Sequence, residues 1–272
     1  RIVEVLEEQP EITDDDAGKE IADDGTEESY DRLLIATGST PFMLPIPGND
    51  LPGVIGYRDI KDTDEMIDAA TKHTHAVVIG GGLLGLEAAN GLKLRGMDVT
   101  VVHQGPWLLE RQLDEVAGRM LQRSLEARGL KFLLQTHTAA LIGGEDGRVA
   151  AVRFKDGLQI PAGLVVMAAG IRPNVALAEA CGLHCERGVV VSDTMQTFDP
   201  RIYAVGECVS HRGIAYGLVA PLFEQARVAA NHLAGHGIGR YTGSVTSTRL
   251  KVTGIDLFSA GDFMGGQESE EI

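Results

Sequence analysis

Glycines stand at positions 80, 82 and 85, directly after a run of apolar residues and before a helix-forming segment, in the stretch VVIGGGLLGLEAA (residues 77–89). The spacing G-x-G-x-x-G between a strand and a helix is typical of a turn that holds the diphosphate of a dinucleotide. The first glycine permits the tight turn, the second lets the backbone approach the diphosphate, and the third lets helix and strand pack closely. The N-terminus of the helix adds free N–H groups that bind phosphate oxygens. We therefore predict a dinucleotide site at Gly80, Gly82, Leu84 and Gly85.

Two side chains beside this turn are candidates for contact with the cofactor. Glu87 falls on the first turn of the expected helix, where the helix dipole favours a carboxylate even without a ligand. His103 ends the next strand, where an NAD enzyme usually has an acidic residue on the ribose 2′-hydroxyl. A neutral histidine can accept a hydrogen bond from that hydroxyl, and a protonated one can tolerate a 2′-phosphate. Arg111 is the nearest downstream cation, and we expect it close to the following helix. We favour NADH over NADPH.

The spacing of cysteines and histidines predicts no metal site. Cys181, Cys185 and Cys208 fit neither a disulfide framework nor a zinc pattern, and we interpret them as buried free thiols. His232 and His236 stand four residues apart near a helix end, but no carboxylate adjoins them, which argues against zinc. Trp107 is expected to pack against the fold, with a position near an adenine as the alternative.

Composition narrows the class of protein. The net charge of −15 disfavours partners such as nucleic acid and anionic membranes. No apolar run approaches the ~20 residues that span a bilayer, and no signal peptide is visible. We expect a cytoplasmic α/β protein that makes no membrane contact.

The elements that must position the glycines follow from hydrophobic periodicity. We predict a strand at residues 76–79, a helix at 83–95 and a strand at 99–102, which together form a βαβ unit. A second helix is predicted at 113–128. The residues assigned to buried helix faces are Leu84, Ala88, Leu92 and Leu94 in the first helix and Leu113, Val116, Met120, Leu121 and Leu125 in the second.

The flanking segments are predicted with less regular structure. Residues 1–30 fit short strands joined by acidic loops, and residues 39–53 fit a loop because prolines interrupt it. A short helix is predicted at 61–70, with Asp62 as its N-cap. A longer helix is predicted at 221–233.

Two further turns made of small residues follow apolar strands, Ala36-Thr37-Gly38 and Ala168-Ala169-Gly170. With the central glycines, they give the chain a pattern that resembles flavoprotein reductases with two dinucleotide-binding domains. Residues 193–208 (DTMQTFDPRIYAVGEC) are similar to the late FAD signature of that family, with Glu207 where the family has aspartate. The resemblance implies FAD contacts at Ala36, Thr37, Gly38, Gly206, Glu207, Pro221 and Leu222, and NAD contacts at Gly170 and, through the nicotinamide ribose, at Glu87.

A closer resemblance covers nearly the whole chain. The stretches YDRLLIATGSTPF, ERQLDEVAG, YAVGEC-x-x-HRG and YGLVAPLFEQA are similar to the large subunit of assimilatory NAD(P)H-dependent nitrite reductase. That family moves a hydride from NAD(P)H to FAD, and electrons then pass to iron–sulfur and siroheme centres that reduce nitrite to ammonium. The cofactors carry this chemistry, so we assign no catalytic residue. The alternatives are a ferredoxin, rubredoxin or disulfide reductase of the same fold, and a non-catalytic NAD-binding module.

The resemblance also implies a domain order. We expect an α/β fold in which a Rossmann-like NAD domain (63–185) is inserted in a partial FAD domain (1–62 and 186–240), followed by the start of a C-terminal interface domain (241–272). The first FAD fingerprint is expected before Arg1, and the cluster and siroheme cysteines after Ile272. We therefore expect this piece to hold FAD weakly or not at all and to be inactive toward nitrite alone. Its expected partners are NAD(P)H and the remaining domains or small subunit, with a homodimer left open.

Overall fold

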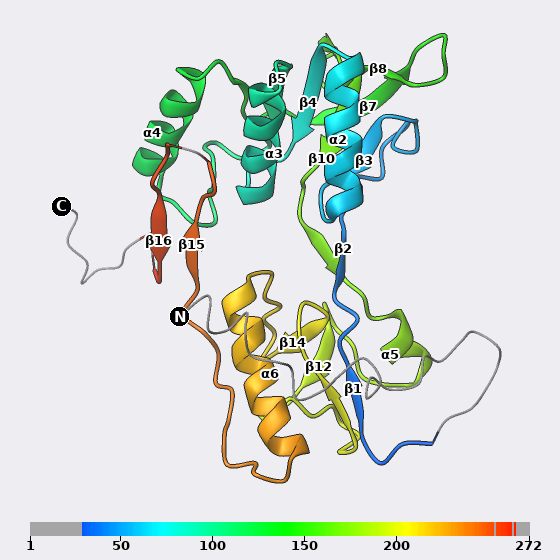
Figure 1. The fold of residues 1–272 in the computed structure, drawn as a ribbon, viewed down its shortest axis with the longest axis vertical. Helices are drawn as coiled ribbons and strands as arrows, with labels where there is room; N and C mark the ends of the chain where they lie inside the picture. Colours follow the sequence, from blue (N-terminus) through cyan, green and yellow to red (C-terminus); the bar gives the residue numbers. More distant parts are fainter. Residues whose placement is uncertain (1–28, 253, 263, 265–272) are drawn as a thin grey trace, which may run out of the picture.

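The computed structural model describes residues 29–252, 254–262 and 264; the strands predicted within residues 1–28 lie outside this range. The described residues form two lobes (Figure 1). The large lobe (residues 42–170) holds a five-stranded sheet, and the small lobe (residues 29–38 and 174–244) holds two two-stranded sheets and a long helix. Strands β2 (Ser39–Pro41) and β11 (Ile171–Pro173) pair antiparallel and connect the lobes.

The large sheet is parallel throughout, in the order β3-β10-β4-β5-β6. Its strands are β3 (Val54–Gly56), β4 (His75–Ile79), β5 (Asp98–Val102), β6 (Lys131–Leu133) and β10 (Leu164–Met167). Helix α3 (Leu83–Leu94) joins β4 to β5 and completes the predicted βαβ unit. The predicted α/β fold class is therefore confirmed.

Side chains alternate between the two faces of this sheet, as the two-residue period of a strand requires. On β4, Val78 joins the core under the helices, whereas Val77 and Ile79 join a second core on the opposite face. That face is covered by an antiparallel sheet of β7 (Thr138–Gly143), β8 (Val149–Phe154) and β9 (Gln159–Pro161). Both faces are covered by apolar cores, which explains why residues 76–79 of β4 and all of β10 are apolar rather than alternating.

Two helix starts differ from or refine the sequence prediction. Helix α2 (Ile60–Lys72) is capped by Asp59, and the predicted cap Asp62 instead occupies the third helical position of a capping box. Helix α4 (Glu115–Glu126) is capped by Asp114, whose carboxylate accepts a hydrogen bond from the Ala117 N–H at 2.8 Å. Both caps satisfy N–H groups that the first turn leaves unpaired.

Part of each predicted buried helix face was wrong. Leu94 in α3 and Val116 and Met120 in α4 are exposed, and Leu84 is 41% exposed. The remaining members of the two sets are buried: Ala88, Leu92, Leu113, Leu121 and Leu125. A strict period of 3.6 residues keeps a helix face narrow, so apolar residues at its margins meet solvent.

The small lobe contains β1 (Leu33–Ile35) paired with β13 (Ile202–Ala204), and β12 (Val189–Val191) paired with β14 (Val209–His211), both parallel. Helix α6 (Val219–Leu233) begins two residues before its predicted start at Pro221. The short helix α5 (Ala176–Ala180) was not predicted. Strand β1 is more than 160 residues from β13 in sequence, so the lobe is built from two distant segments.

One short strand, β2, corrects the predicted loop at residues 39–53. β2 stands at the start of this segment. Its hydrogen bonds come from pairing with β11, which the local sequence does not predict.

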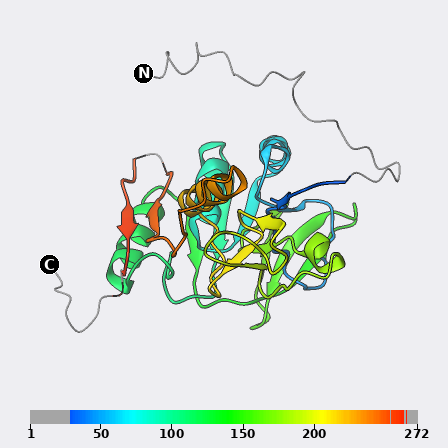
Figure 2. The same cartoon turned by 90° about the horizontal axis from the view of Figure 1, so that it is seen from below.

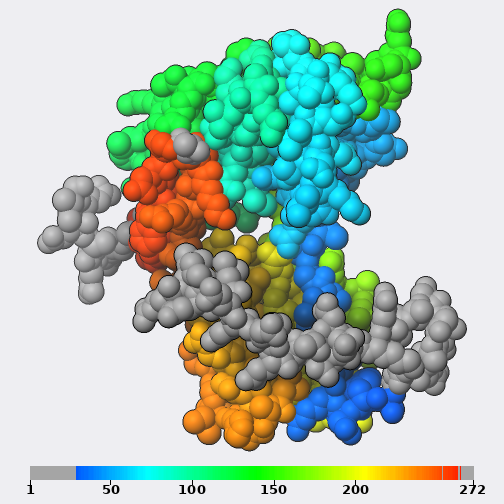
Figure 3. Space-filling model, in the orientation of Figure 1, coloured from blue at the N-terminus to red at the C-terminus, as the bar shows by residue number. Residues whose placement is uncertain are grey.

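The hairpin of β15 (Ser247–Arg249) and β16 (Phe258–Ala260) lies against the large lobe beside α4 (Figures 2 and 3). The Ser259 hydroxyl donates to the Gln112 carbonyl at 2.5 Å, which fixes this placement.

Candidate functional site

The three glycines form a tight turn between β4 and α3, and two of them have no room for a side chain. A Cβ on Gly80, which has φ of +128°, would lie 2.3 Å from the Ala168 carbonyl oxygen. A Cβ on Gly85 would lie 2.0 Å from the Gly80 carbonyl oxygen. A Cβ on Gly82, by contrast, would meet nothing within 4 Å. Gly80 and Gly85 therefore serve the fold, whereas the bare backbone at Gly82 faces open space where a ligand can approach.

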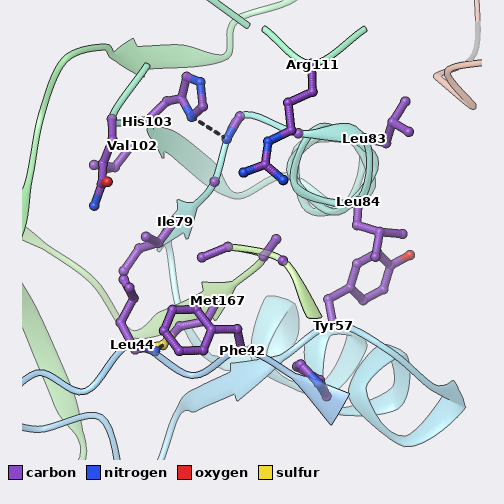
Figure 4. A pocket seen from close by; sticks show the side chains of 18 of the residues that line it. Phe42, Leu44, Tyr57, Ile79, Leu83, Leu84, Val102, His103, Arg111 and Met167 are labelled. Atoms are coloured by element: carbon purple, nitrogen blue, oxygen red, sulfur yellow. Dashed lines mark hydrogen bonds between the residues drawn. The ribbon is translucent and has the colours of Figure 1, made fainter. Parts of the chain in front are cut away.

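A cleft of about 390 Å³ opens over this turn (Figure 4). Its floor is the backbone of residues 80–82, and its walls carry Phe42, Tyr57, Leu84 and Arg111. Burial and then the negative charge of nearby Glu87 raise the pKa of Tyr57. The cleft is thus apolar and aromatic on one side and cationic over the start of α3, where Figure 4 shows the Arg111 guanidinium.

The cleft continues toward the small lobe as a second hollow of about 720 Å³, which shares Leu84, Arg111 and Gly170 with the first. Among the described residues, four arginines and one carboxylate line this second part. The arginines are Arg58, Arg111, Arg172 and Arg187, and the carboxylate is that of Glu207. In a chain of net charge −15 this concentration of cations favours an anionic ligand.

Two helices begin at the cleft, and neither has a side-chain cap. Helix α3 follows Gly82 and α6 follows Leu218, and both of these residues line the cleft. Helices α2 and α4, whose N-caps lie outside the cleft lining, are capped by aspartates. The free N–H groups and positive dipole ends of α3 and α6 are therefore available to phosphate or to another anionic group.

His103 lies at the end of β5, as predicted, but both of its ring nitrogens contact this chain. Nδ1 accepts a hydrogen bond from the Gly81 N–H at 3.1 Å (Figure 4), and Nε2 contacts the Glu110 carboxylate. Because Nδ1 accepts, Nε2 carries the proton and donates it to Glu110. The structure thus brings together the predicted residue and Glu110, for which no cofactor contact was predicted.

The two strand-end turns singled out in the sequence lie at opposite ends of the β2–β11 connection, where Gly38 is beside Asn174 and Gly170 is beside Phe42. The Asn174 amide donates to the Thr37 carbonyl at 2.8 Å, and the Thr37 hydroxyl donates to the Asn174 carbonyl at 2.7 Å. Gly38, Gly170 and Gly206 all have positive φ, and a Cβ on any of them would meet nothing within 4 Å. The three strand ends therefore present bare backbone toward open space, as a close backbone approach to a ligand requires.

Glu207 is almost fully buried and holds two groups from other parts of the chain. It accepts a hydrogen bond from the Ser39 hydroxyl at 2.7 Å and forms an ion pair with Arg58. Ser39 belongs to the connection between the lobes, and Arg58 immediately precedes the capping residue of α2. The carboxylate predicted to contact FAD thus also joins the small lobe to the large lobe and to the connection between them.

The remaining predicted residues fall at the margins of the cleft. Glu87 does not line it, and its carboxylate accepts a hydrogen bond from the Lys251 N–H at 3.1 Å. Pro221 is buried and Leu222 half-buried in the first turn of α6, behind the residues that face the cleft. Four further lining residues were not predicted, because they lie on connections whose path only the fold defines: Phe42, Tyr57, Arg58 and Arg172. The guanidinium carbon of Arg172 lies 4.3 Å from the centroid of the Phe42 ring.

The cysteines are free, as predicted, but only Cys208 is buried. Cys181 is exposed and Cys185 half-buried, which corrects the prediction of three buried thiols. Trp107 packs on α4 as expected, since a Cβ on Gly118 would lie 2.5 Å from its ring. Within the described part of the chain no group of three metal-ligating side chains was found, and no helix there is long and apolar enough to cross a membrane.

The family model for pyridine nucleotide-disulphide oxidoreductases matches residues 1–232, which is most of the chain. The chain belongs to this family. The matched range includes the glycine turn and all the strands of the large sheet.

Relatives narrow the position within the family. The oxidoreductase is 58% identical to nitrite reductase [NAD(P)H] of Bacillus subtilis over 89% of this chain and 30% of that protein. It is 38% identical to the nitrite reductase (NADH) large subunit of Escherichia coli over 87% of this chain and 28% of that protein. These figures confirm the predicted resemblance, and the chain spans less than a third of the length of these curated relatives.

Solved structures confirm the fold. A ferredoxin reductase of Rhodopseudomonas palustris superposes with a TM-score of 0.81 and 28% identity, over 86% of this chain and 59% of that chain. The two-lobed arrangement is therefore shared with reductases that differ from the nitrite enzymes in what they reduce.

Proposed function

We propose that this oxidoreductase binds NAD(P)H over the glycine turn and brings it to an FAD at the small-lobe end of the cleft. In this proposal it is the diaphorase part of a nitrite reductase large subunit. The single observation that carries the proposal is the continuity of the cleft, in which Leu84, Arg111 and Gly170 line both hollows. Two dinucleotides must meet ring to ring for hydride transfer, and a cleft with a glycine turn at one end and open strand ends at the other accommodates that meeting.

The residues present fit NAD(P)H and the flavin end of FAD. Gly80, Gly82 and Gly85 give the first diphosphate a backbone cradle at the start of α3, with Arg111 as its cationic neighbour. Gly38, Gly206 and the uncapped start of α6 offer bare backbone and a positive dipole end for the flavin. When bound, NAD(P)H supplies the hydride and FAD accepts it. The chain orients both and excludes water.

The route beyond the flavin is proposed from the relatives. Identity of 58% to a nitrite reductase supports transfer to iron–sulfur and siroheme centres outside this chain, in the cytoplasm where thiols stay reduced. The structural match to a ferredoxin reductase favours a redoxin as the second candidate acceptor. A disulfide acceptor has less support, because none of the three cysteines lines either described hollow.

The test uses the protein at its full encoded length, mixed with NADH without oxygen while flavin absorbance is followed. Bleaching of the flavin, followed by its recovery when nitrite is added, is the expected result. Recovery with ferredoxin but not with nitrite would select the second candidate. A bound flavin that stays oxidised in the presence of bound NADH would contradict the proposal and favour a non-catalytic binding module.

A further inference from the structure

The end of β5 lacks the group that usually selects between the two pyridine nucleotides. In dinucleotide-binding folds an acidic residue there accepts a hydrogen bond from the adenosine ribose 2′-hydroxyl and so favours NAD over NADP. Here β5 ends at Val102 and is followed by His103. The side chain of His103 is largely buried, and its ring is held between the Gly81 N–H and Glu110. His103 therefore has no free ring nitrogen for a ribose hydroxyl.

A carboxylate reaches the same place from the following loop. Glu110 lies between β5 and α4, lines the 390 Å³ cleft with the glycine turn, and has its Oε2 against His103 Nε2. Gly105 makes room for this arrangement, because a Cβ there would lie 2.7 Å from Glu110 Oε2 and 2.6 Å from His103 Nε2. The Glu110 side chain keeps about a third of its surface exposed.

One oxygen of Glu110 remains available. Within the described part of the chain no hydrogen bond joins Oε1 to another residue, whereas Oε2 is held by His103. His103 is itself fixed by the backbone of the glycine turn, so the carboxylate is positioned relative to the diphosphate cradle. A carboxylate in this position can accept a hydrogen bond from a hydroxyl group and repels a phosphate group.

The neighbouring cation lies in another part of the cleft. Figure 4 shows the Arg111 guanidinium over the start of α3, with His103 on the strand side of the turn. Arg111 lines both hollows, whereas His103 and Glu110 line only the first. This separation assigns Arg111 to the diphosphate and leaves the strand side of the turn with a negative charge.

We propose that Glu110, positioned by His103, accepts a hydrogen bond from the adenosine ribose 2′-hydroxyl and makes this site selective for NADH over NADPH. The inference rests on the proposed function, because it requires a dinucleotide at the glycine turn. His103, a sequence candidate for contact with the ribose, then has the role of positioning the carboxylate.

The test measures binding of ADP-ribose and of 2′-phospho-ADP-ribose by titration calorimetry, so that no hydride transfer is involved. The proteins are wild type, Glu110→Gln and, as a control that removes one negative charge outside the cleft, Glu115→Gln. Wild type is expected to prefer ADP-ribose by at least about tenfold, as one charge-assisted hydrogen bond supplies. Glu110→Gln should lower that ratio about tenfold, and Glu115→Gln should keep it.

A wild type that binds 2′-phospho-ADP-ribose as tightly as ADP-ribose would overturn this inference without any variant. So would a folded Glu110→Gln protein that binds both probes with the wild-type ratio. If wild type binds neither probe, the proposed function fails and this inference fails with it. In the His103→Leu variant the ratio should fall toward that of Glu110→Gln, since the carboxylate is no longer held.

Discussion

The guanidinium of Arg58 donates to the buried carboxylate of Glu207 and so joins the start of α2 in the large lobe to the turn after β13 in the small lobe. The two residues are 149 positions apart in sequence. The Ser39 hydroxyl adds a third contact from the connection between the lobes. The pair therefore sets how the walls of the cleft face one another.

This ion pair is expected to stabilise the protein by about 1–2 kcal/mol. The value is below the roughly 3–5 kcal/mol for breaking a fully buried pair, because Arg58 is about a third exposed and solvent screens it. Arg58→Gln, Glu207→Gln and the double variant form a cycle measured by urea unfolding. We expect a coupling free energy of about 1–2 kcal/mol. Strictly additive effects would show that the contact does not hold the lobes.

Gly85→Ala is expected to disrupt the turn. Its Cβ would lie 2.0 Å from a backbone oxygen that cannot move aside cheaply. Overpacking of this kind destabilises by about 1–3 kcal/mol. Thermal unfolding should show a lower midpoint, and ADP-ribose binding should be lost with it; an unchanged midpoint would mean that the strand and helix are not in close contact.

Gly82→Ala is expected to separate binding from stability. Gly82 has φ of −84°, which alanine adopts freely, and its Cβ would meet nothing within 4 Å. The free energy of unfolding should change by less than about 0.5 kcal/mol, while ADP-ribose affinity should fall about tenfold or more because the methyl group occupies the diphosphate position. Gly91→Ala, in the same helix and also without a neighbour, is the control: it should raise stability by up to about 1 kcal/mol and leave binding unchanged. Equal affinities for the three proteins would contradict the placement.

Arg111→Gln is expected to weaken binding through the diphosphate alone. Loss of a charge-assisted contact should lower ADP-ribose affinity about tenfold and make the remaining affinity less sensitive to salt. Adenosine, which has no diphosphate, should bind wild type and variant alike. Calorimetry at two ionic strengths checks this, and an equal loss for adenosine would place Arg111 elsewhere.

Stability should fall in acid through Asp193. Hydrogen bonds from Arg212 and then His211 lower the pKa of this carboxyl from 3.8 to about 2 in the folded protein. The folded pKa lies below the unfolded one, so the stabilisation is complete above about pH 4 and is lost as the pH falls toward 2. Asp193→Asn should flatten this part of the pH dependence, as urea unfolding between pH 5 and 2.5 can show. A variant with the wild-type slope would assign the acid sensitivity to other carboxylates.

Local pattern predicted the central unit well. The β4–α3–β5 unit combines apolar strands, a glycine spacing and a helix of the usual length, and each of these signals points to the same structure. The long-range contacts had no such signal. Strand β2 forms only because β11 lies opposite it, more than 130 residues later, and its own sequence contains a proline.

The candidate site shows the same division. The spacing of the glycines at 80, 82 and 85 predicts a site from sequence alone. Arg58 and Glu110 have a role only because the fold places Glu207 beside the first and His103 beside the second. A carboxylate directly after a strand can be found from sequence. Glu110 lies seven residues beyond His103 and returns to the strand end by contacting it, and such a carboxylate cannot be found from sequence.

The most direct test of the account is a crystal structure of the protein with NADH bound. It should place the diphosphate against the backbone of residues 81–84 at the start of α3 and the adenosine ribose beside Glu110. NADH bound instead at the open turns of Gly38 and Gly206 in the small lobe, with the glycine turn empty, would contradict it.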